Sequence, residues 1–278
     1  MTRLVIDQII SIPEKMQSYD GELLTKTGCT LSQLAAESAG LNGDQVAPDC
    51  SVAVIPVNSG QGMITGFSEA VCAIAAHLGF QAYITGFSDV GGLVEAYEKN
   101  ADLIIMADDQ FYAAINLNTH LVASNDQATA YGYTVALGKM AGGLSGKEVL
   151  LIGAGPVGRE AGVALCKAGA MTIVYDLDKK KEIELTIKLK EEFGTQAVLS
   201  AMNLGQALAR KPLIFDASPG ASIIPAALVD ENTMIAAPGL PLGLDEQALC
   251  KVGKRLIHDP LQIGTAVMLF KVLSNSNS

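Results

Sequence analysis

The 278-residue sequence contains no tryptophan and few basic side chains. Its 19 lysines and arginines are outnumbered by 29 aspartates and glutamates, giving a formal charge of −10. Because nucleic-acid binding needs a basic surface that displaces counterions, this balance argues against a nucleic-acid partner. The one lysine run, 179–181, lies among glutamates in DKKKEIELTIKLKEEFG and is typical of a solvated helix face.

Long apolar runs and paired cysteines are also missing. No uninterrupted apolar run approaches the roughly 18 residues of a bilayer span. The start, MTRLVIDQIISIPEK, has Asp7 inside its apolar stretch and no small-residue cleavage site, unlike a signal peptide. The five cysteines form no CxxC pair, which argues against disulfides and zinc, and the three histidines are too dispersed for a metal site. We therefore expect a cytoplasmic protein with no membrane contact and no metal.

What the sequence does contain is apolar segments, 49% of its residues, in a regular alternation. Residues 1 to about 47 are typical of amphipathic helices. From Ser51 onward, the strand-like SVAVIPV, FQAYITG and ADLIIMA alternate with the helix-like FSEAVCAIAAHLG and DVGGLVEAYEKN. This order predicts parallel strands joined by right-handed crossovers. The segment FYAAINLNTHLVAS, with its turn at 116–119, predicts a hairpin.

The predicted fold class is α/β. An N-terminal helical segment and a small parallel α/β substrate domain precede a Rossmann domain for NAD, and a C-terminal helix packs back. The expected boundaries are 1–125 for the helical and substrate part, 126–142 for a connecting helix, 143–256 for the Rossmann domain, and 257–278 for the C-terminal helix and tail.

The strongest motif is GAGPVG, a G-x-G-x-x-G fingerprint at residues 153–158. An apolar strand, EVLLI, precedes it, and a second strand, MTIVYD, ends in Asp176 at close to the roughly 20-residue interval expected. Gly153 permits the tight turn, Gly155 lets the backbone approach a pyrophosphate, and Gly158 lets helix and strand pack closely. The carboxylate of Asp176 can accept hydrogen bonds from a ribose and would repel a 2′-phosphate, which favours NAD over NADP.

Further loops at predicted strand ends complete the expected cofactor site. PLIFDASPG and TMIAAPG each place small residues after a buried strand, and the loop at the end of PLIFDASPG is expected on the nicotinamide side. The expected cofactor contacts are Gly153, Gly155, Pro156, Val157, Gly158, Asp176, Ala217, Ser218, Pro219 and Pro238.

A second glycine-rich corner, NSGQGMITGFSEA, also follows a strand and opens a helix, where open α/β sheets bind ligands. Asn58 offers polar contacts, Gly62 permits close backbone approach, Phe67 adds an apolar wall and Ser68 a hydroxyl. Its ITGFSE is echoed by ITGFSD from Ile84. We expect the first copy to bind a ligand. The second copy should be only a structural turn, in which Ser88 or Asp89 caps the next helix. A merely capped helix remains the alternative for the first copy.

MADDQF places two adjacent carboxylates after a buried strand, and we expect one of them to face the cleft. Asp108, nearer the strand end, could hold an ammonium group or accept its proton. A helix cap or a surface pair explains the position equally well. Asn125 could orient a substrate beside the nicotinamide, and His258 is the one histidine with a plausible cleft position.

Several segments together resemble the PylD family of pyrrolysine-forming dehydrogenases. They are VNSGQGMITGFSEAV, FSDVGGLVEAYEKNADLIIMADDQF, SND, AGGLSGKEVLLIGAGPVG and HDPLQIG, covering most of 52–176 and the stretch near His258. The likeness is weak over the first fifty residues and from about 180 to 250. Their joint order is far more specific than the fingerprint alone.

The resemblance implies an NAD-dependent oxidation of 3-methylornithyl-N6-lysine at its terminal amine carbon. Ring closure with loss of ammonia would then give pyrrolysine. The expected partner is this small isopeptide, with a homodimer as a possible assembly. By similarity, the catalytic residues are Asp108 and Asn125, and the substrate-binding residues are Leu4, Asn58, Gly62, Phe67, Ser68, Asp108, Asn125 and His258.

Two other functions fit parts of the sequence. Shikimate-dehydrogenase and methylene-tetrahydrofolate-dehydrogenase types share the expected architecture, but they usually place a catalytic lysine in the substrate domain. Here only Lys15, Lys26 and Lys99 precede Asp108, and none lies at a predicted strand end. A non-catalytic NAD-sensing protein would bind the cofactor without turnover.

Overall fold

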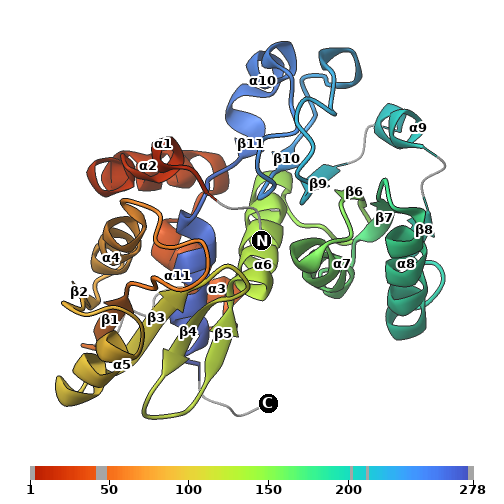
Figure 1. The fold of residues 1–278 in the computed structure, drawn as a ribbon. Helices are drawn as coiled ribbons and strands as arrows, with labels where there is room; N and C mark the ends of the chain where they lie inside the picture. Colours follow the sequence, from red (N-terminus) through yellow and green to blue (C-terminus); the bar gives the residue numbers. More distant parts are fainter. Residues whose placement is uncertain (1–3, 42–48, 201–202, 211–212, 275–278) are drawn as a thin grey trace. The chain divides into compact units, whose positions relative to one another are not determined.

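The structure, a computed structural model, describes residues 4–41, 49–200, 203–210 and 213–274 (Figure 1). The chain divides into two compact units. The first comprises Met1–Thr25, Cys29–Gly132 and Pro260–Ser278, and the second comprises Lys26–Gly28 and Tyr133–Asp259. Each unit has a sheet and a core of its own. Among the described helices, none is both long and apolar enough to cross a membrane.

The first unit is built on a five-stranded mixed sheet with the order β2-β1-β3-β4-β5. Strands β2, β1 and β3 are parallel, and β3, β4 and β5 are antiparallel, which confirms the predicted crossovers and hairpin. Its elements are α1 (Ile6–Ile9), α2 (Ile12–Thr27), α3 (Leu31–Ser38), β1 (Ser51–Ile55), α4 (Phe67–His77), β2 (Gln81–Ile84), α5 (Asp89–Glu98), β3 (Leu103–Ala107), β4 (Tyr112–Asn116), β5 (Val122–Ser124), the start of α6 (Asn125–Ala141) and α11 (Gln262–Lys271).

Alternating side chains of this sheet enter two different apolar layers, as the period of a strand requires. Ala53, Ile55 and Ile104 pack with Ala96 of α5 on one face. On the other face, Tyr112 bonds through its hydroxyl to Thr265 Oγ1 of α11 at 2.7 Å. The C-terminal helix therefore packs back on the first unit, as predicted.

Helix α11 is the most deeply buried element of this unit. Every residue from Gln262 to Phe270 is buried, and the helix contacts α3, α4, β4 and β5. In Figure 1 the blue α11 accordingly lies among the red-to-yellow elements. A segment made late in the chain thus completes the core of a unit that begins at the N-terminus.

The second unit is a Rossmann fold. Its six parallel strands have the order β11-β10-β9-β6-β7-β8, in which the strand order reverses beside β6. The elements are the end of α6, β6 (Glu148–Ile152), α7 (Pro156–Lys167), β7 (Met171–Tyr175), α8 (Lys179–Phe193), β8 (Val198–Ser200), α9 (Leu204–Ala209), β9 (Leu213–Asp216), η1 (Ala226–Leu228), β10 (Ile235–Ala236), α10 (Glu246–Val252), η2 (Gly253–Arg255) and β11 (Leu256–Ile257).

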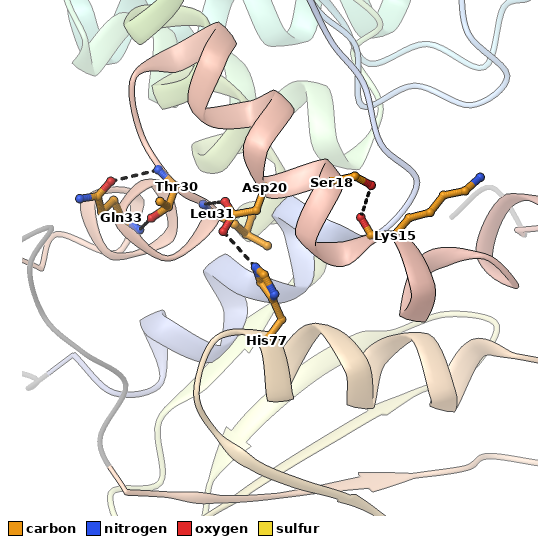
Figure 2. Close-up of polar contacts among 7 residues, drawn as sticks. All are labelled: Lys15, Ser18, Asp20, Thr30, Leu31, Gln33 and His77. Carbon is orange, nitrogen blue, oxygen red and sulfur yellow. Dashed lines mark hydrogen bonds and ion pairs between the residues drawn. The ribbon is translucent and has the colours of Figure 1, made fainter.

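One carboxylate joins three helices of the N-terminal layer in the first unit. Asp20 of α2 accepts the backbone N–H of Leu31, at the start of α3, at 2.6 Å, and its other oxygen lies 2.9 Å from His77 Nε2 of α4. Figure 2 shows Asp20 between these two partners. The N–H of Leu31 is one of the donors that a helix start leaves without a partner inside the helix. Asp20 thus joins α2 and α3 to α4, the helix that begins in the glycine-rich corner NSGQGMITGFSEA.

We predict that Asp20→Ala lowers the free energy of unfolding by about 1–2 kcal/mol, because it removes a helix-capping acceptor and an inter-helix bond together. Urea unfolding followed by circular dichroism measures this change. Ser18→Ala is the matched control, since the hydroxyl of Ser18 bonds only to the carbonyl of Lys15 in its own helix (Figure 2). Equal unfolding energies for the two variants would show that Asp20 does not join the helices.

Candidate active site

A pocket of about 110 Å³ lies in the first unit where β1 and β3 end. These strands are neighbours, and β2 lies on the far side of β1, so the strand order reverses here. Ligands of open α/β sheets bind in the crevice outside the strand ends at such a reversal. The lining residues are Leu4, Ile55, Pro56, Val57, Ser59, Gln61, Gly62, Met63, Ile64, Phe67, Ser68, Ala107, Asp108 and Asp109.

The glycine-rich wall of the pocket is held by Asp109. Its Oδ2 accepts the backbone N–H of Gln61 at 2.8 Å. Gly60, at φ 72°, lies so close that a Cβ there would be 2.1 Å from the same oxygen. A side chain at position 60 would therefore push the loop off the carboxylate. Asp109, the second of the two adjacent carboxylates, therefore shapes the pocket wall.

Asp108 presents the other carboxylate in an ionised form. Its Oδ1 accepts the backbone N–H groups of Phe111 and Gln110, each at 2.7 Å. These two bonds hold the pKa of the Asp108 carboxyl below its usual value, because they stabilise the charged form. Within the described residues, Oδ2 has no hydrogen-bond partner. A fixed negative charge with one oxygen available suits an ammonium group.

The N-terminal end of helix α4 carries a positive partial charge, opposite in sign to the Asp108 carboxylate. The helix begins at Phe67, and Phe67 and Ser68 line the pocket, so this positive end of the helix lies at the pocket. The ring of Phe67 packs edge-on against Tyr112, with centroids 5.4 Å apart, and this fixes the aromatic wall. A pocket with a carboxylate on one side and a helix N-terminus on another fits a molecule that carries both an ammonium and a carboxyl or carbonyl group.

Three predicted substrate residues are not among those that line this pocket: Asn58, Asn125 and His258. Asn58 donates its backbone N–H to Asp89 Oδ1 at 3.0 Å and its amide to Ser88 Oγ at 2.7 Å. Asn125 accepts the hydroxyl of Thr129 at 3.2 Å. The expectation that a side chain of Ser88 or Asp89 caps α5 is wrong for Ser88, which occupies the N-cap position without a side-chain capping bond. Ser88 and Asp89, in the second ITGFS corner, instead hold Asn58 of the first glycine-rich loop through hydrogen bonds.

The fingerprint of the second unit has the close packing that a dinucleotide loop requires. A Cβ on Gly158 would lie 1.9 Å from the carbonyl oxygen of Gly153, and one on Gly153, at φ 97°, would lie 3.0 Å from the backbone of Ala217. A Cβ on Gly155 would meet no described atom within 4 Å, which leaves that side of the loop open. Pro156 is the first residue of α7 and Val157 the second. These residues fit a pyrophosphate at a helix start.

Asp176 ties the fingerprint to the end of β7. Its Oδ2 accepts the N–H of Ala154 at 2.6 Å, and its Oδ1 accepts the N–H of Asp178 at 2.8 Å. A carboxylate can accept about four hydrogen bonds, so both oxygens retain capacity for ribose hydroxyls. Asp176 is thus in place both to shape the loop and to bind a ribose.

The remaining predicted cofactor residues follow two neighbouring strands, and a predicted substrate residue follows the next strand of the sheet. Ala217, Ser218 and Pro219 come after β9, Pro238 after β10, and the substrate candidate His258 after β11. The carboxyl ends of these parallel strands lie along one edge of the sheet. The Nδ1 of His258 donates to the carbonyl of Ala237 at 2.7 Å, which leaves Nε2 as the ring's second polar atom. His258 belongs to the second unit, whereas the residues that line the pocket all belong to the first.

Two carboxylates hold loops in ways that the sequence pattern does not predict. Asp109 clamps the glycine loop, and Asp216, the last residue of β9, bonds to Ser218. In both cases the detectable signal was a charged residue at the end of an apolar strand. Among the described residues, no group of three potential ligands could hold a metal ion.

The fold and the fingerprint define the class of protein, a two-unit Rossmann protein with a dinucleotide-binding loop. The structure of quinate dehydrogenase from Corynebacterium glutamicum in complex with NAD matches this chain with a TM-score of 0.56. The two are 14% identical, and the match covers 81% of this chain and 94% of that chain. Shikimate dehydrogenase from Aquifex aeolicus gives a TM-score of 0.52 at 18% identity over 81% and 92%. At these identities the likeness shows the fold alone.

Sequence relatives give the family. Residues 8–123 match the family described as "Pyrrolysine biosynthesis protein PylD, N-terminal domain". Pyrrolysine synthases from Methanosarcina acetivorans and Methanosarcina barkeri are each 31% identical to the chain over 274 residues, covering 98% of this chain and 100% and 98% of theirs. The chain belongs to the PylD family.

We predict opposite outcomes for two neighbouring glycines of the fingerprint. Gly158→Ala should lower the free energy of unfolding by at least about 1 kcal/mol, because its Cβ meets the carbonyl of Gly153. Gly155→Ala should unfold like the parent protein and yet bind a dinucleotide at least roughly tenfold more weakly, because a methyl group then occupies the open side of the loop. Thermal unfolding and calorimetric titration with NAD measure the two effects. Unchanged NAD affinity in Gly155→Ala would move the pyrophosphate elsewhere.

Proposed function

We propose that the protein is an NAD-dependent dehydrogenase that oxidises 3-methylornithyl-N6-lysine at its terminal amine carbon, leading to pyrrolysine. The observation that carries this proposal is the 31% identity to two pyrrolysine synthases over nearly the whole chain. The ionised Asp108 in a pocket at the strand reversal supports an amine substrate. The proposal includes a cytoplasmic location and a homodimer as the assembly.

The second unit would hold the cofactor. Gly153, Gly155 and Gly158 form the loop for the pyrophosphate, and Asp176 would accept the adenosine ribose hydroxyls. Its negative charge disfavours a 2′-phosphate, which makes NAD the proposed cofactor rather than NADP. When bound, NAD supplies the hydride acceptor.

The first unit would orient the amine. The substrate carbon gives up a hydride and its nitrogen gives up a proton, which leaves a C=N bond. The α-amino nitrogen then attacks that carbon, ammonia leaves and the five-membered ring closes. Asp108 would hold the ammonium form before reaction, with Phe67 and Leu4 as apolar walls. Its lowered pKa makes it a weak proton acceptor, so we assign it charge pairing rather than general-base catalysis.

The competing functions fit the pocket less well. A shikimate-dehydrogenase type of enzyme would place a lysine in this pocket, and no lysine is among its described lining residues. Lys15 lies on α2 and Lys99 at the end of α5, where it pairs with Glu95. A non-catalytic NAD sensor remains the alternative from another class, and it predicts binding of NAD without formation of NADH.

The direct experiment incubates the purified protein with the synthetic isopeptide and NAD. We expect NADH absorbance to rise and mass spectrometry to detect the cyclised product, with little turnover when NADP replaces NAD. Binding of NAD with no NADH formation would support the sensor instead. Turnover of shikimate or quinate, but not of the isopeptide, would support the shikimate-dehydrogenase type.

We predict that Asp108→Asn lowers kcat/KM for the isopeptide at least roughly tenfold and leaves NAD affinity unchanged, because the variant loses the charge that holds the ammonium group. Steady-state kinetics and calorimetry measure these quantities. Gln110→Ala is the matched control, since Asp108 uses only the backbone N–H of Gln110. Parental kinetics in Asp108→Asn would limit Asp108 to shaping its turn.

A further inference from the structure

The Rossmann unit buries one carboxylate whose charge the fold does not need. Asp216 is the last residue of β9, and none of its surface is exposed. Its Oδ1 accepts the hydroxyl of Ser218 at 2.7 Å and the backbone N–H of Ser218 at 3.1 Å. Its Oδ2 is buried and has no hydrogen-bond partner among the described residues. A buried polar atom without a partner costs stability and calls for an explanation.

The backbone around Asp216 is shaped to admit this carboxylate. A Cβ on Gly243 would lie 2.1 Å from Asp216 Oδ2, so any side chain at position 243 would collide with it. Gly239 donates its N–H to the carbonyl of Asp216 at 2.9 Å, and a Cβ there would lie 2.2 Å from the carbonyl of Ser218. Two glycines therefore let the chain close around the strand end. The clamp on Ser218 uses one oxygen, which an uncharged side chain could also supply.

Burial makes the Asp216 carboxylate easier to protonate than an exposed one. Removal from water raises the pKa of this carboxyl to about 6, although the two bonds from Ser218 and the charge of His258 lower it in part. His258 follows β11, while the neighbouring strand ends at Ile152 and Ala236 and the segment 239–243 carry no ionisable side chain. The group is therefore ionised at pH 7 and becomes neutral as the pH falls through about 6.

Asp216 also lies at the point where the strand order of the Rossmann sheet reverses. It pairs in register with Ile152, the last residue before the fingerprint, on the neighbouring strand β6. Ser218 and Pro219, two and three residues further on, are in the loop expected on the nicotinamide side. A dinucleotide in this crevice would carry a cationic ring when oxidised and a neutral ring when reduced.

We propose that Asp216 is the counter-charge of the nicotinamide cation and makes the protein bind the oxidised dinucleotide more tightly than the reduced one. This inference rests on the dinucleotide binding in the proposed function and goes beyond it, because it assigns a role to a residue that need not touch the ligand. Asp216 is a positioning residue in this role: it holds Ser218 through one oxygen and acts on the ring by its charge. A buried charge acts more strongly than an exposed one because little water screens it.

The test compares the parent protein and the Asp216→Asn variant in their affinities for three ligands. Calorimetry or fluorescence titration at pH 8 gives Kd for NAD⁺, for NADH and for ADP-ribose, which lacks the ring. We expect the variant to bind NAD⁺ roughly tenfold more weakly and the other two within about twofold of the parent protein, because only the cation loses a charge partner.

A pH series on the parent protein tests the same idea without relying on the variant's folding. Between pH 8 and pH 5.5, the affinity for NAD⁺ relative to ADP-ribose should fall as Asp216 takes up a proton. The fall should persist in His258→Asn and vanish in Asp216→Asn, because His258 is the other titratable group acting on this carboxyl. This comparison separates the carboxyl from the imidazole.

Four results would overturn the proposal. An equal loss for all three ligands in Asp216→Asn would reduce the residue to a structural clamp. A parental NAD⁺ affinity in a folded Asp216→Asn variant, or a pH effect that disappears in His258→Asn, would assign the charge effect elsewhere. If the parent protein bound none of the three ligands, there would be no cofactor site for Asp216 to act on. If it bound NAD⁺ but did not turn over the isopeptide, only the proposed substrate would be wrong.

Discussion

In both sheets the strand order reverses beside the first strand of the unit, and this reversal is the constraint on which the candidate sites depend. Connections that leave in opposite directions uncover the carboxyl ends of two neighbouring parallel strands. In the first unit these are β1 and β3, and the pocket with Asp108 lies there. In the second unit they are β6 and β9, whose ends carry the fingerprint and Asp216.

The loops at these strand ends are held by carboxylates, from the exposed Asp109 to the buried Asp216, and glycines leave room for them. Asp109 fastens the backbone at Gln61 beside Gly60, Asp176 fastens the loop at Ala154, and Asp216 fastens Ser218 beside Gly243. In each case an acceptor with two oxygens satisfies N–H groups that a tight loop would otherwise leave without partners. A ligand entering either crevice therefore meets backbone that is already ordered, which limits the entropy lost on binding.

Much of this organisation was predictable from the sequence, because it depends on local patterns. Apolar runs separated by helical segments predicted both sheets, and GAGPVG with Asp176 predicted the Rossmann unit and the residues of its loop. Side-chain contacts between distant segments were not predictable. The pairing of Asn58 with Ser88 and Asp89, and the division of tasks between Asp108 and Asp109, depend on which strand ends become neighbours. No local signal carries that information.

The deep burial of α11 has a consequence for the order in which the chain can fold during synthesis. The ribosome delivers residues 133–259 before it delivers this helix, so the Rossmann sheet can form while the first unit still has an open core. Until α11 arrives, the apolar surfaces of α3 and α4 that it later covers are exposed in the nascent chain. That interval is when the unfinished protein is most exposed to aggregation and most dependent on chaperones.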